Sequence, residues 1–331
     1  MNKCRICEVR DATKKNSHQL PGFLGVMISS NGDYRRGKEL MFTFNKYQSG
    51  VYAYGLDSTK WEEIFDGLTD KRIRQISVNP ISEDYVFCPQ CEKMLGEYLE
   101  SPYSVFFKEG GSIAPDIPLM FWVSVVWRLS TQGTNGFNLG IELNERLRKI
   151  LNTYLQCKNS GEDVLGLVEN IDIFYRIVGC KDFCKTNAGY FHCRYDAQNK
   201  FLAIIVGDVC VCINLAGEEI PPSFSLYGIE NYIRNAPINN GQTMEQRIEI
   251  AERDYKCVVS NFVKHAAQIK KQGLFEIADE LWKLHFCGVM PLSKKYAFAE
   301  KLVSADVKLG DRYSPEIILK SFEEVAFDPL I

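Results

Sequence analysis

The sequence predicts an α+β protein of two domains: a small N-terminal module at residues 1–108 and a larger, mainly helical domain with a small antiparallel sheet at residues 112–331. Three observations support this prediction. Two CxxC pairs lie near opposite ends of the first hundred residues, so the chain between them is tied into one module. A Gly- and Pro-rich stretch at residues 109–115 then breaks the chain. Helical periodicity follows that break, and 331 residues, 46% of them hydrophobic, suffice for two cores.

The cysteine pairs are Cys4 with Cys7 and Cys88 with Cys91. Each pair supplies two thiolates from one tight turn. Two such turns brought together form the closed tetrahedral cage of four sulfur atoms that structural Zn²⁺ prefers. The alternative is four unrelated buried thiols, and the polar residues around both pairs argue against it. The sequence therefore predicts one structural zinc site.

The segment between the two pairs is expected to be rich in β-structure. Short strands are predicted at residues 39–44 and 50–56, since turn-forming stretches separate them. After the second pair, the pattern predicts a helix over residues 92–99. We expect this helix to end before Ser101-Pro102, because helical geometry is disfavoured for a residue that precedes proline.

The first part of the larger domain is predicted to be helical around a small sheet. The apolar run from Ile117 to Val126 meets Arg128 well short of the roughly 20 residues of a membrane span, so we expect a buried helix. A hairpin is predicted at residues 190–194 and 201–213. A second helix carries one apolar stripe, made by Leu143, Leu147, Ile150, Leu151 and Tyr154.

The C-terminal part is predicted to be helical as well. A Thr243/Gln246 capping-box pair indicates a helix that begins at Thr243 and ends at Gly273. Pro315 suits the first turn of a last helix. The residues of that helix expected to face inward are Ile318, Phe322 and Val325.

Charge and composition restrict the partners of the protein. A net charge of −3 and a pI near 5.9 give no general attraction to polyanions, so binding of DNA would need a local basic patch. The N-terminus has no signal-peptide pattern, and the scattered cysteines are typical of a reducing compartment. We therefore expect a cytoplasmic protein with no membrane partner. The candidate basic clusters are Lys14/Lys15, Arg35/Arg36/Lys38 and Lys71/Arg72/Arg74.

The larger domain shows no motif of a known chemistry: no P-loop, no dinucleotide fingerprint and no nucleophile elbow. A second zinc site from Cys180, Cys184, His192 and Cys193 is a weak alternative. Adjacent residues of a strand point to opposite faces, so His192 and Cys193 cannot both be ligands. His265 and His285 are expected to be ordinary core or surface histidines.

Three segments carry a resemblance to a known family. Lys3-Cys4-Arg5-Ile6-Cys7, Ser17-His18-Gln19-Leu20-Pro21 and Cys88-Pro89-Gln90-Cys91-Glu92 are similar, in this order, to the motifs of the four-cysteine HNH endonucleases, a ββα-metal family. The resemblance covers the N-terminal module alone and implies a zinc-bound treble-clef or HNH-like fold. Further along, residues 121–128 and 147–151 look like the second domain of uncharacterised bacterial proteins with the same module.

The resemblance implies a metal-dependent nuclease that hydrolyses nucleic-acid phosphodiesters, in bacterial defence against phage or other foreign DNA. It makes His18 the general base. Ser17 takes the place of the family's acidic metal ligand, and Glu92 takes the place of its last histidine, where an oxygen can still bind catalytic Mg²⁺ or Mn²⁺. The remaining candidates, for the family's asparagine and for a further ligand, are Glu83, Asn79 and Glu97.

A function of another class competes with this one. The module can instead be a non-catalytic, zinc-stabilised surface for DNA or for a protein partner, with a degenerate HNH site. In that case His18 only forms hydrogen bonds that fix the turn before Pro21. The larger domain can also carry an activity of its own, by binding a ligand, a protein partner or a second copy of the chain.

Overall fold

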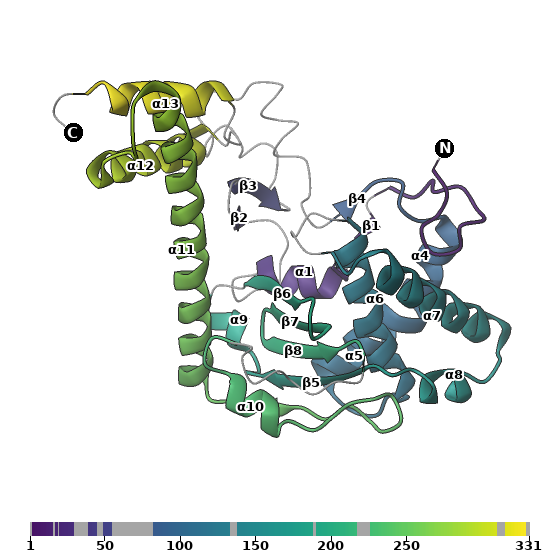
Figure 1. The fold of residues 1–331 in the computed structure, drawn as a ribbon. Coiled ribbons are helices and arrows are strands. Elements are labelled where there is room, and N and C mark those ends of the chain that lie inside the picture. Colours follow the sequence, from purple (N-terminus) through teal and green to yellow (C-terminus); the bar gives the residue numbers. More distant parts are fainter. Residues whose placement is uncertain are drawn as a thin grey trace. The chain divides into compact units, whose positions relative to one another are not determined.

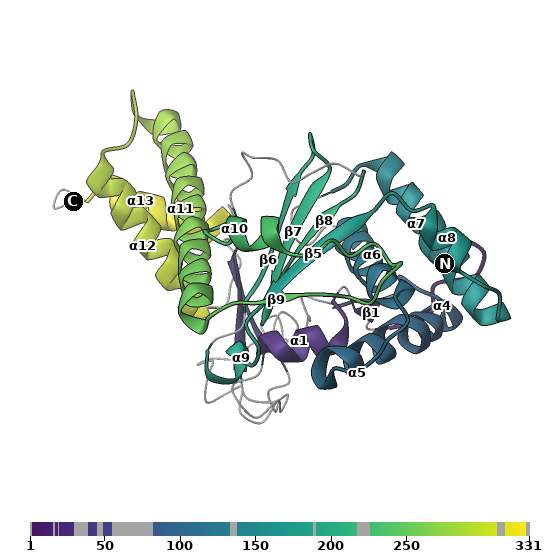
Figure 2. The ribbon, with the colours of Figure 1, turned by 90° about the horizontal axis from the view of Figure 1, so that it is seen from below.

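The computed structural model describes residues 2–15, 17–18, 20–29, 39–44, 49–54, 82–132, 138–187, 190–216, 226–309 and 315–328. It is a mixed α+β protein, as predicted (Figures 1 and 2). Contacts divide the chain into two compact units, one of Met1–Tyr34 with Pro80–Val259 and one of Arg35–Asn79 with Ser260–Ile331. The predicted boundary at residues 108–112 lies inside the first unit, between two helices, and the independence of residues 1–108 stays a prediction.

The cysteine-bearing part of the first unit consists of a short pair of strands followed by a helix. Strand β1 (Ser17–His18) pairs with β4 (Ser82–Glu83) in antiparallel register, with Ser17 opposite Glu83. Helix α4 (Pro89–Leu95) follows β4, and helix α1 (Gly22–Ser29) follows β1. Residues distant in sequence therefore meet at the start of α4.

The helix after the second cysteine pair does not end before Ser101-Pro102, contrary to the sequence prediction. Helix α4 passes directly into a π-helical turn, η2 (Gly96–Glu100), and then into α5 (Ser101–Glu109). The Ser101 N–H donates to the Gly96 carbonyl, which is the wider bond of a π-helix. Pro102 has no N–H to donate into the preceding turn, and it is in that turn that the helix takes its wider π-helical form.

Two long helices pack against the cysteine-bearing part of the unit. Helix α6 (Asp116–Gln132) is buried along most of its length, which confirms the expected buried helix. Helix α7 (Ile141–Ser160) contacts α6 and α4. The buried stripe of α7 is largely the predicted one and consists of Leu147, Leu151, Tyr154 and Leu155. A left-handed Gly161 ends α7, and the short α8 (Leu165–Glu169) follows.

A sheet of five strands forms the rest of the unit, in the order β6-β7-β8-β5-β9 (Figure 2). The first four of these form antiparallel pairs with one another, and β9 is parallel to β5. Residues 201–213, predicted as one arm of a hairpin, form two strands around Gly207, whose φ is 54°. The strands are β5 (Phe174–Gly179), β6 (Phe191–Asp196), β7 (Phe201–Val206), β8 (Val209–Asn214) and β9 (Ile248–Glu249); the short helices are α9 (Phe183–Thr186) and α10 (Glu230–Asn235).

A buried carboxyl group links the sheet to the helices of this unit. Tyr175 Oη donates to Glu245 Oε2 at 2.6 Å, and Tyr103 Oη donates to the same carboxyl at 3.0 Å. Trp122 Nε1 donates in turn to Tyr103 Oη at 3.0 Å. Burial raises the pKa of Glu245, although both tyrosine hydroxyls and Arg247 oppose the rise.

This raised pKa predicts a pH dependence of stability. Above pH ~4.3, the ordinary glutamate value, the unfolded chain releases the Glu245 proton while the folded protein still holds it. The unfolded state then binds fewer protons, so the free energy of unfolding falls as pH rises toward the raised pKa. We expect Glu245→Gln to flatten this fall in urea denaturation measured from pH 4 upward. An equal slope in the wild type and the variant would contradict the assignment.

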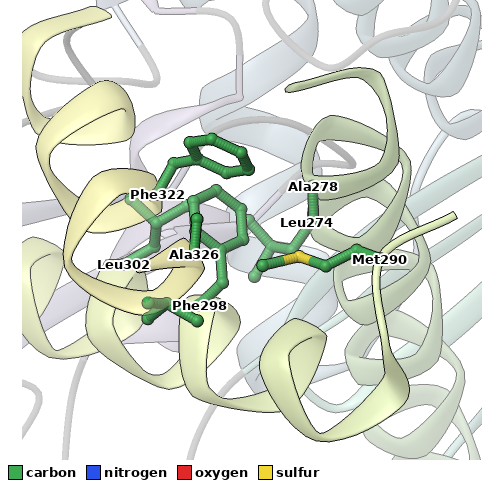
Figure 3. Packing of buried hydrophobic residues seen from close by; sticks show 8 residues of the cluster. Leu274, Ala278, Met290, Phe298, Leu302, Phe322 and Ala326 are labelled. Carbon is green, nitrogen blue, oxygen red and sulfur yellow. The ribbon is translucent and has the colours of Figure 1, made fainter. Parts of the chain in front are cut away.

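The second unit contains a hairpin and a helical cluster. The hairpin pairs β2 (Glu39–Phe44) with β3 (Ser49–Tyr54), close to the predicted strands. Helices α12 (Leu292–Leu309) and α13 (Pro315–Ala326) pack with the larger part of α11 (Glu252–His285). Figure 3 shows their core, which consists of Leu274, Ala278, Met290, Phe298, Leu302, Phe322, Val325 and Ala326. The predicted start of α13 at Pro315 is confirmed.

The predicted bounds of the preceding helix, α11, are wrong at both ends. The Gln246 N–H donates to Asn239 Oδ1 at 2.8 Å, and its carbonyl accepts from Asn239 Nδ2 at 2.9 Å. These two bonds hold the segment extended up to β9, so the helix begins at Glu252. It also continues through Gly273, because the next turn packs Leu274 and Ala278 into the core. No helix in the described ranges has the length and apolarity needed to cross a membrane.

Candidate metal centre

Four cysteine side chains meet at one point of the first unit. The Sγ atoms of Cys4, Cys7, Cys88 and Cys91 all lie within 4.8 Å of one another. Four sulfur atoms at about 2.3 Å from a central Zn²⁺ lie somewhat closer together, so at most a small inward movement completes the tetrahedron. No other group of three or more His, Cys, Asp or Glu side chains in the described part of the chain can hold a metal. The four-cysteine cluster can therefore hold a structural metal ion such as zinc.

The first cysteine pair lies on a turn that its own backbone closes. The Cys4 N–H donates to the Arg10 carbonyl at 2.8 Å, and the Glu8 N–H donates to the Cys4 carbonyl at 2.8 Å. Glu8 has a left-handed φ of 56°, which allows the chain to reverse after Cys7. The spacing of Cys4 and Cys7 is thus fixed by local geometry.

The second pair lies at the beginning of α4. Cys88 is the N-cap of this helix, and its Sγ accepts from the Cys91 N–H at 3.4 Å. The Arg5 N–H donates to the Val86 carbonyl at 3.0 Å, and this bond joins the two cysteine turns. The backbone bonds of the two turns therefore bring the four sulfur atoms to one point.

The cluster also attracts positive charge. A hydrogen bond from the Cys91 thiol lowers the pKa of Cys4 to about 4, and the same bond together with burial raises the pKa of Cys91. Burial raises the pKa of Cys88. Arg10 bonds to Cys88, which raises the pKa of its guanidinium. A group of thiols that already holds one negative charge is a suitable donor set for a dication.

His18 lies on β1, with a half-buried side chain. Its strand pairs with β4, where Ser82 lies opposite His18. Helix α4, which carries Glu92, comes after β4 in the chain. Because Ser17, the neighbour of His18, interacts with the Glu92 carboxyl, His18 and Glu92 lie in the same part of the unit.

Two buried oxygen atoms of this region have few partners. Ser17 is fully buried, and neither its Oγ nor Glu92 Oε2 has a hydrogen-bond partner among the described residues beyond the interaction of these two side chains with each other. Burial raises the pKa of the Glu92 carboxyl, and nearby Glu100 adds to the rise. Arg128, Lys14 and a hydrogen bond from the Ser17 hydroxyl oppose it, so these side chains belong to one local environment. A carboxylate oxygen is a donor of the kind that Mg²⁺ and Mn²⁺ prefer.

Arg128 is the residue of this region to which the sequence analysis assigned no role. It lies on α6 and is 2% exposed, although its guanidinium is charged. Nη1 donates to the His18 carbonyl at 3.2 Å and to Glu100 Oε1 at 2.7 Å. The signal in the sequence was a single arginine at the end of an apolar helix, a residue type that is almost never fully buried without a partner.

Glu97 does not join this group. Glu97 is exposed and lies 3.9 Å from Lys93 in an ion pair on the surface of the helix. Glu83 lies on β4, opposite Ser17 in the strand register. Asn79 lies outside the described residues, as do the basic clusters at residues 35–38 and 71–74. Of the predicted basic patch, only Lys14 and Lys15 are described, and Lys15 Nζ lies 5.9 Å from the centre of the Tyr85 ring.

The weak second zinc site is not formed. Cys180, Cys184, His192 and Cys193 all lie in the described ranges, and they do not come together as a metal-binding group. His192 Nε2 instead lies 2.8 Å from Tyr227 Oη, and the Cys184 N–H donates to Asp208 Oδ1 at 2.8 Å.

Comparisons of the chain with protein-family models, with curated proteins and with solved structures find no match.

Proposed function

We propose that the protein is a metal-dependent nuclease that hydrolyses nucleic-acid phosphodiesters, with His18 as the general base and Glu92 as a ligand of Mg²⁺ or Mn²⁺. One observation carries the proposal: Ser17 Oγ and Glu92 Oε2 are buried together with no hydrogen-bond partner among the described residues beyond each other, and Ser17 is adjacent to His18. Buried polar atoms are rarely left without partners unless an ion, a water or a catalytic role explains them. The resemblance to the four-cysteine HNH endonucleases supports the same assignment.

In this proposal, each residue has a separate task. His18 takes a proton from a water molecule, whose oxygen attacks the phosphorus while the bond to the leaving oxygen breaks. The leaving oxygen takes a proton from solvent. Ser17 and Glu92 supply oxygen ligands, and a bound dication would stabilise the charge on the phosphorane and on the leaving oxygen. The four cysteines take no part in the reaction, because a closed four-sulfur site has no open position for substrate.

The test is cleavage of plasmid and single-stranded DNA by the purified protein with Mg²⁺ or Mn²⁺. We expect Glu92→Ala and Glu92→Gln to lose cleavage at unchanged zinc content, since both remove the charged oxygen ligand. Glu97→Ala is the matched control, because Glu97 is an exposed glutamate on η2, the turn that follows α4. Full activity of Glu92→Ala, or loss of activity in Glu97→Ala, would contradict the assignment of Glu92.

The competing proposal is a zinc-stabilised module that binds DNA or a protein without catalysis. The neutral Ser17 favours it, because a hydroxyl is a poorer ligand for a hard dication than a carboxylate. The net charge of −3 favours a protein partner over DNA. If the zinc-loaded wild-type protein cleaves neither DNA nor RNA with Mg²⁺ or Mn²⁺, this result supports the binding proposal over the nuclease proposal. The role in bacterial defence against foreign DNA belongs to the nuclease proposal and falls with it.

A further inference from the structure

We infer that Arg128 is a positioning residue of the candidate nuclease site: from helix α6 it fixes the backbone of His18 and holds the neighbouring Glu100 in an ion pair. The inference rests on the proposed function, since it concerns the residue proposed as general base. It also gives α6, which lies beyond the N-terminal module, a direct part in the site.

The guanidinium of Arg128 is held from three directions. Nε donates to the Ser124 carbonyl at 3.3 Å, and Nη2 donates to Ser124 Oγ at 3.3 Å. Nη1 is shared between the His18 carbonyl at 3.2 Å and Glu100 Oε1 at 2.7 Å. Arg128 and Ser124 both lie on α6, so these two bonds fix the guanidinium to that helix. The direction in which Nη1 points is therefore set by α6.

This bond matters because it reaches the backbone of His18 from outside its own strand pair. Among the described residues, β1 pairs with β4 at Ser17 and His18. The bond from Arg128 adds an anchor at the carbonyl of His18 itself, from a fully packed helix. A base must lie within hydrogen-bond reach of the water that it deprotonates, so a backbone that shifts also moves the imidazole.

The charge of Arg128 is needed as well as its shape. Arg128 Nη1 forms an ion pair with Glu100 Oε1 at 2.7 Å. Arg128 is almost completely buried, while Glu100 is 25% exposed. Removing the positive charge would leave the Glu100 carboxylate without this counter-ion. Lysine keeps the charge but has one nitrogen, which cannot reproduce the fork to Ser124, His18 and Glu100.

The experiment compares Arg128→Lys with a matched control, Arg148→Lys. Arg148 is also a largely buried arginine, and its Nη1 donates to a backbone carbonyl of the cysteine module, that of Ile6, at 2.9 Å. Its carboxylate partners are Glu8 and Glu145. Two properties are measured for each zinc-loaded variant: the kinetics of DNA cleavage, and the Cε1–Hε1 NMR resonance of His18, assigned with His18→Ala among the four histidines of the chain.

We expect Arg128→Lys to lower kcat about 100-fold, the loss typical of a catalytic group displaced by an ångström, with KM unchanged. We also expect it to shift the His18 resonance and leave those of His192, His265 and His285 in place. Arg148→Lys should change neither property. In the His18→Ala background, Arg128→Lys should have no further effect on residual cleavage, because it acts through the imidazole that is already absent.

Unchanged kcat and an unchanged His18 resonance in Arg128→Lys would overturn the inference, and so would equal effects in Arg148→Lys. If Arg128→Lys fails to bind zinc, Glu100→Gln is measured instead. This variant keeps Arg128 but weakens the bond between Nη1 and residue 100. The His18 resonance should then shift, by less than in Arg128→Lys. If the wild type cleaves no nucleic acid, the proposed function fails, whereas the His18 resonance still decides whether Arg128 positions this residue.

Discussion

Removal of the metal from the four-cysteine cluster is expected to unfold the N-terminal part of the first unit. In zinc-finger peptides, a structural Zn²⁺ contributes an apparent binding free energy of about 10–16 kcal/mol at neutral pH. The total stability of a native protein is only about 5–15 kcal/mol, so loss of the ion outweighs what packing alone can supply. The same result is expected for Cys88→Ser, because a serine hydroxyl does not replace a thiolate ligand.

The measurement is zinc content together with protection of backbone amides from hydrogen exchange. We expect one zinc per chain, and loss of protection in α4 and in residues 2–15 after chelation or in Cys88→Ser. Cys157→Ser is the control, since this half-buried cysteine lies on α7, outside the cluster. The core of α11, α12 and α13 should stay protected, because none of the four cysteines belongs to it. A zinc-free protein with full protection in α4 would show that the cluster is not a structural metal site.

Phe322→Ala is expected to cost about 3–5 kcal/mol of the free energy of unfolding, as truncation of a buried phenylalanine does. Phe322 is fully buried in the core of the second unit. Its ring centre lies 6.4 Å from those of Phe298 and Trp282, and 5.5 Å from that of His285. The truncation therefore leaves a cavity where α11, α12 and α13 meet (Figure 3).

Leu319→Ala on the same helix is the matched comparison, since Leu319 is 44% exposed and its loss opens no cavity. The free energy of unfolding of both variants is measured by urea denaturation, monitored by far-UV circular dichroism. The zinc content of each variant should stay at the wild-type value. A loss of stability in Phe322→Ala as small as that in Leu319→Ala would show that the three helices do not share this core.

The sequence was most informative where residue type and spacing directly determine structure. The CxxC spacing predicted the cysteine cluster, and the apolar run before Arg128 predicted a buried helix; both are confirmed. The turn-forming stretches around residues 39–44 and the proline at the start of α13 predicted those elements correctly. In each case a short local pattern is enough to determine the geometry.

Patterns failed where distant contacts override a local signal. The capping-box pair at Thr243 forms no helix, because Asn239 binds both backbone groups of Gln246. Gly273 ends no helix, since tertiary packing of the following turn outweighs the cost of a glycine, about 1 kcal/mol. The role of Arg128 could not be predicted, because it depends on a contact with His18 across 110 positions of the chain.

The most direct test of the account is whether added imidazole restores DNA cleavage to His18→Ala. The account predicts that zinc-loaded wild type cleaves DNA with Mg²⁺ or Mn²⁺ and that His18→Ala does not. Free imidazole should then restore part of the activity, because a base of the same chemistry can enter the space of the half-buried side chain. Cleavage by His18→Ala at the wild-type rate, without imidazole, would contradict the account.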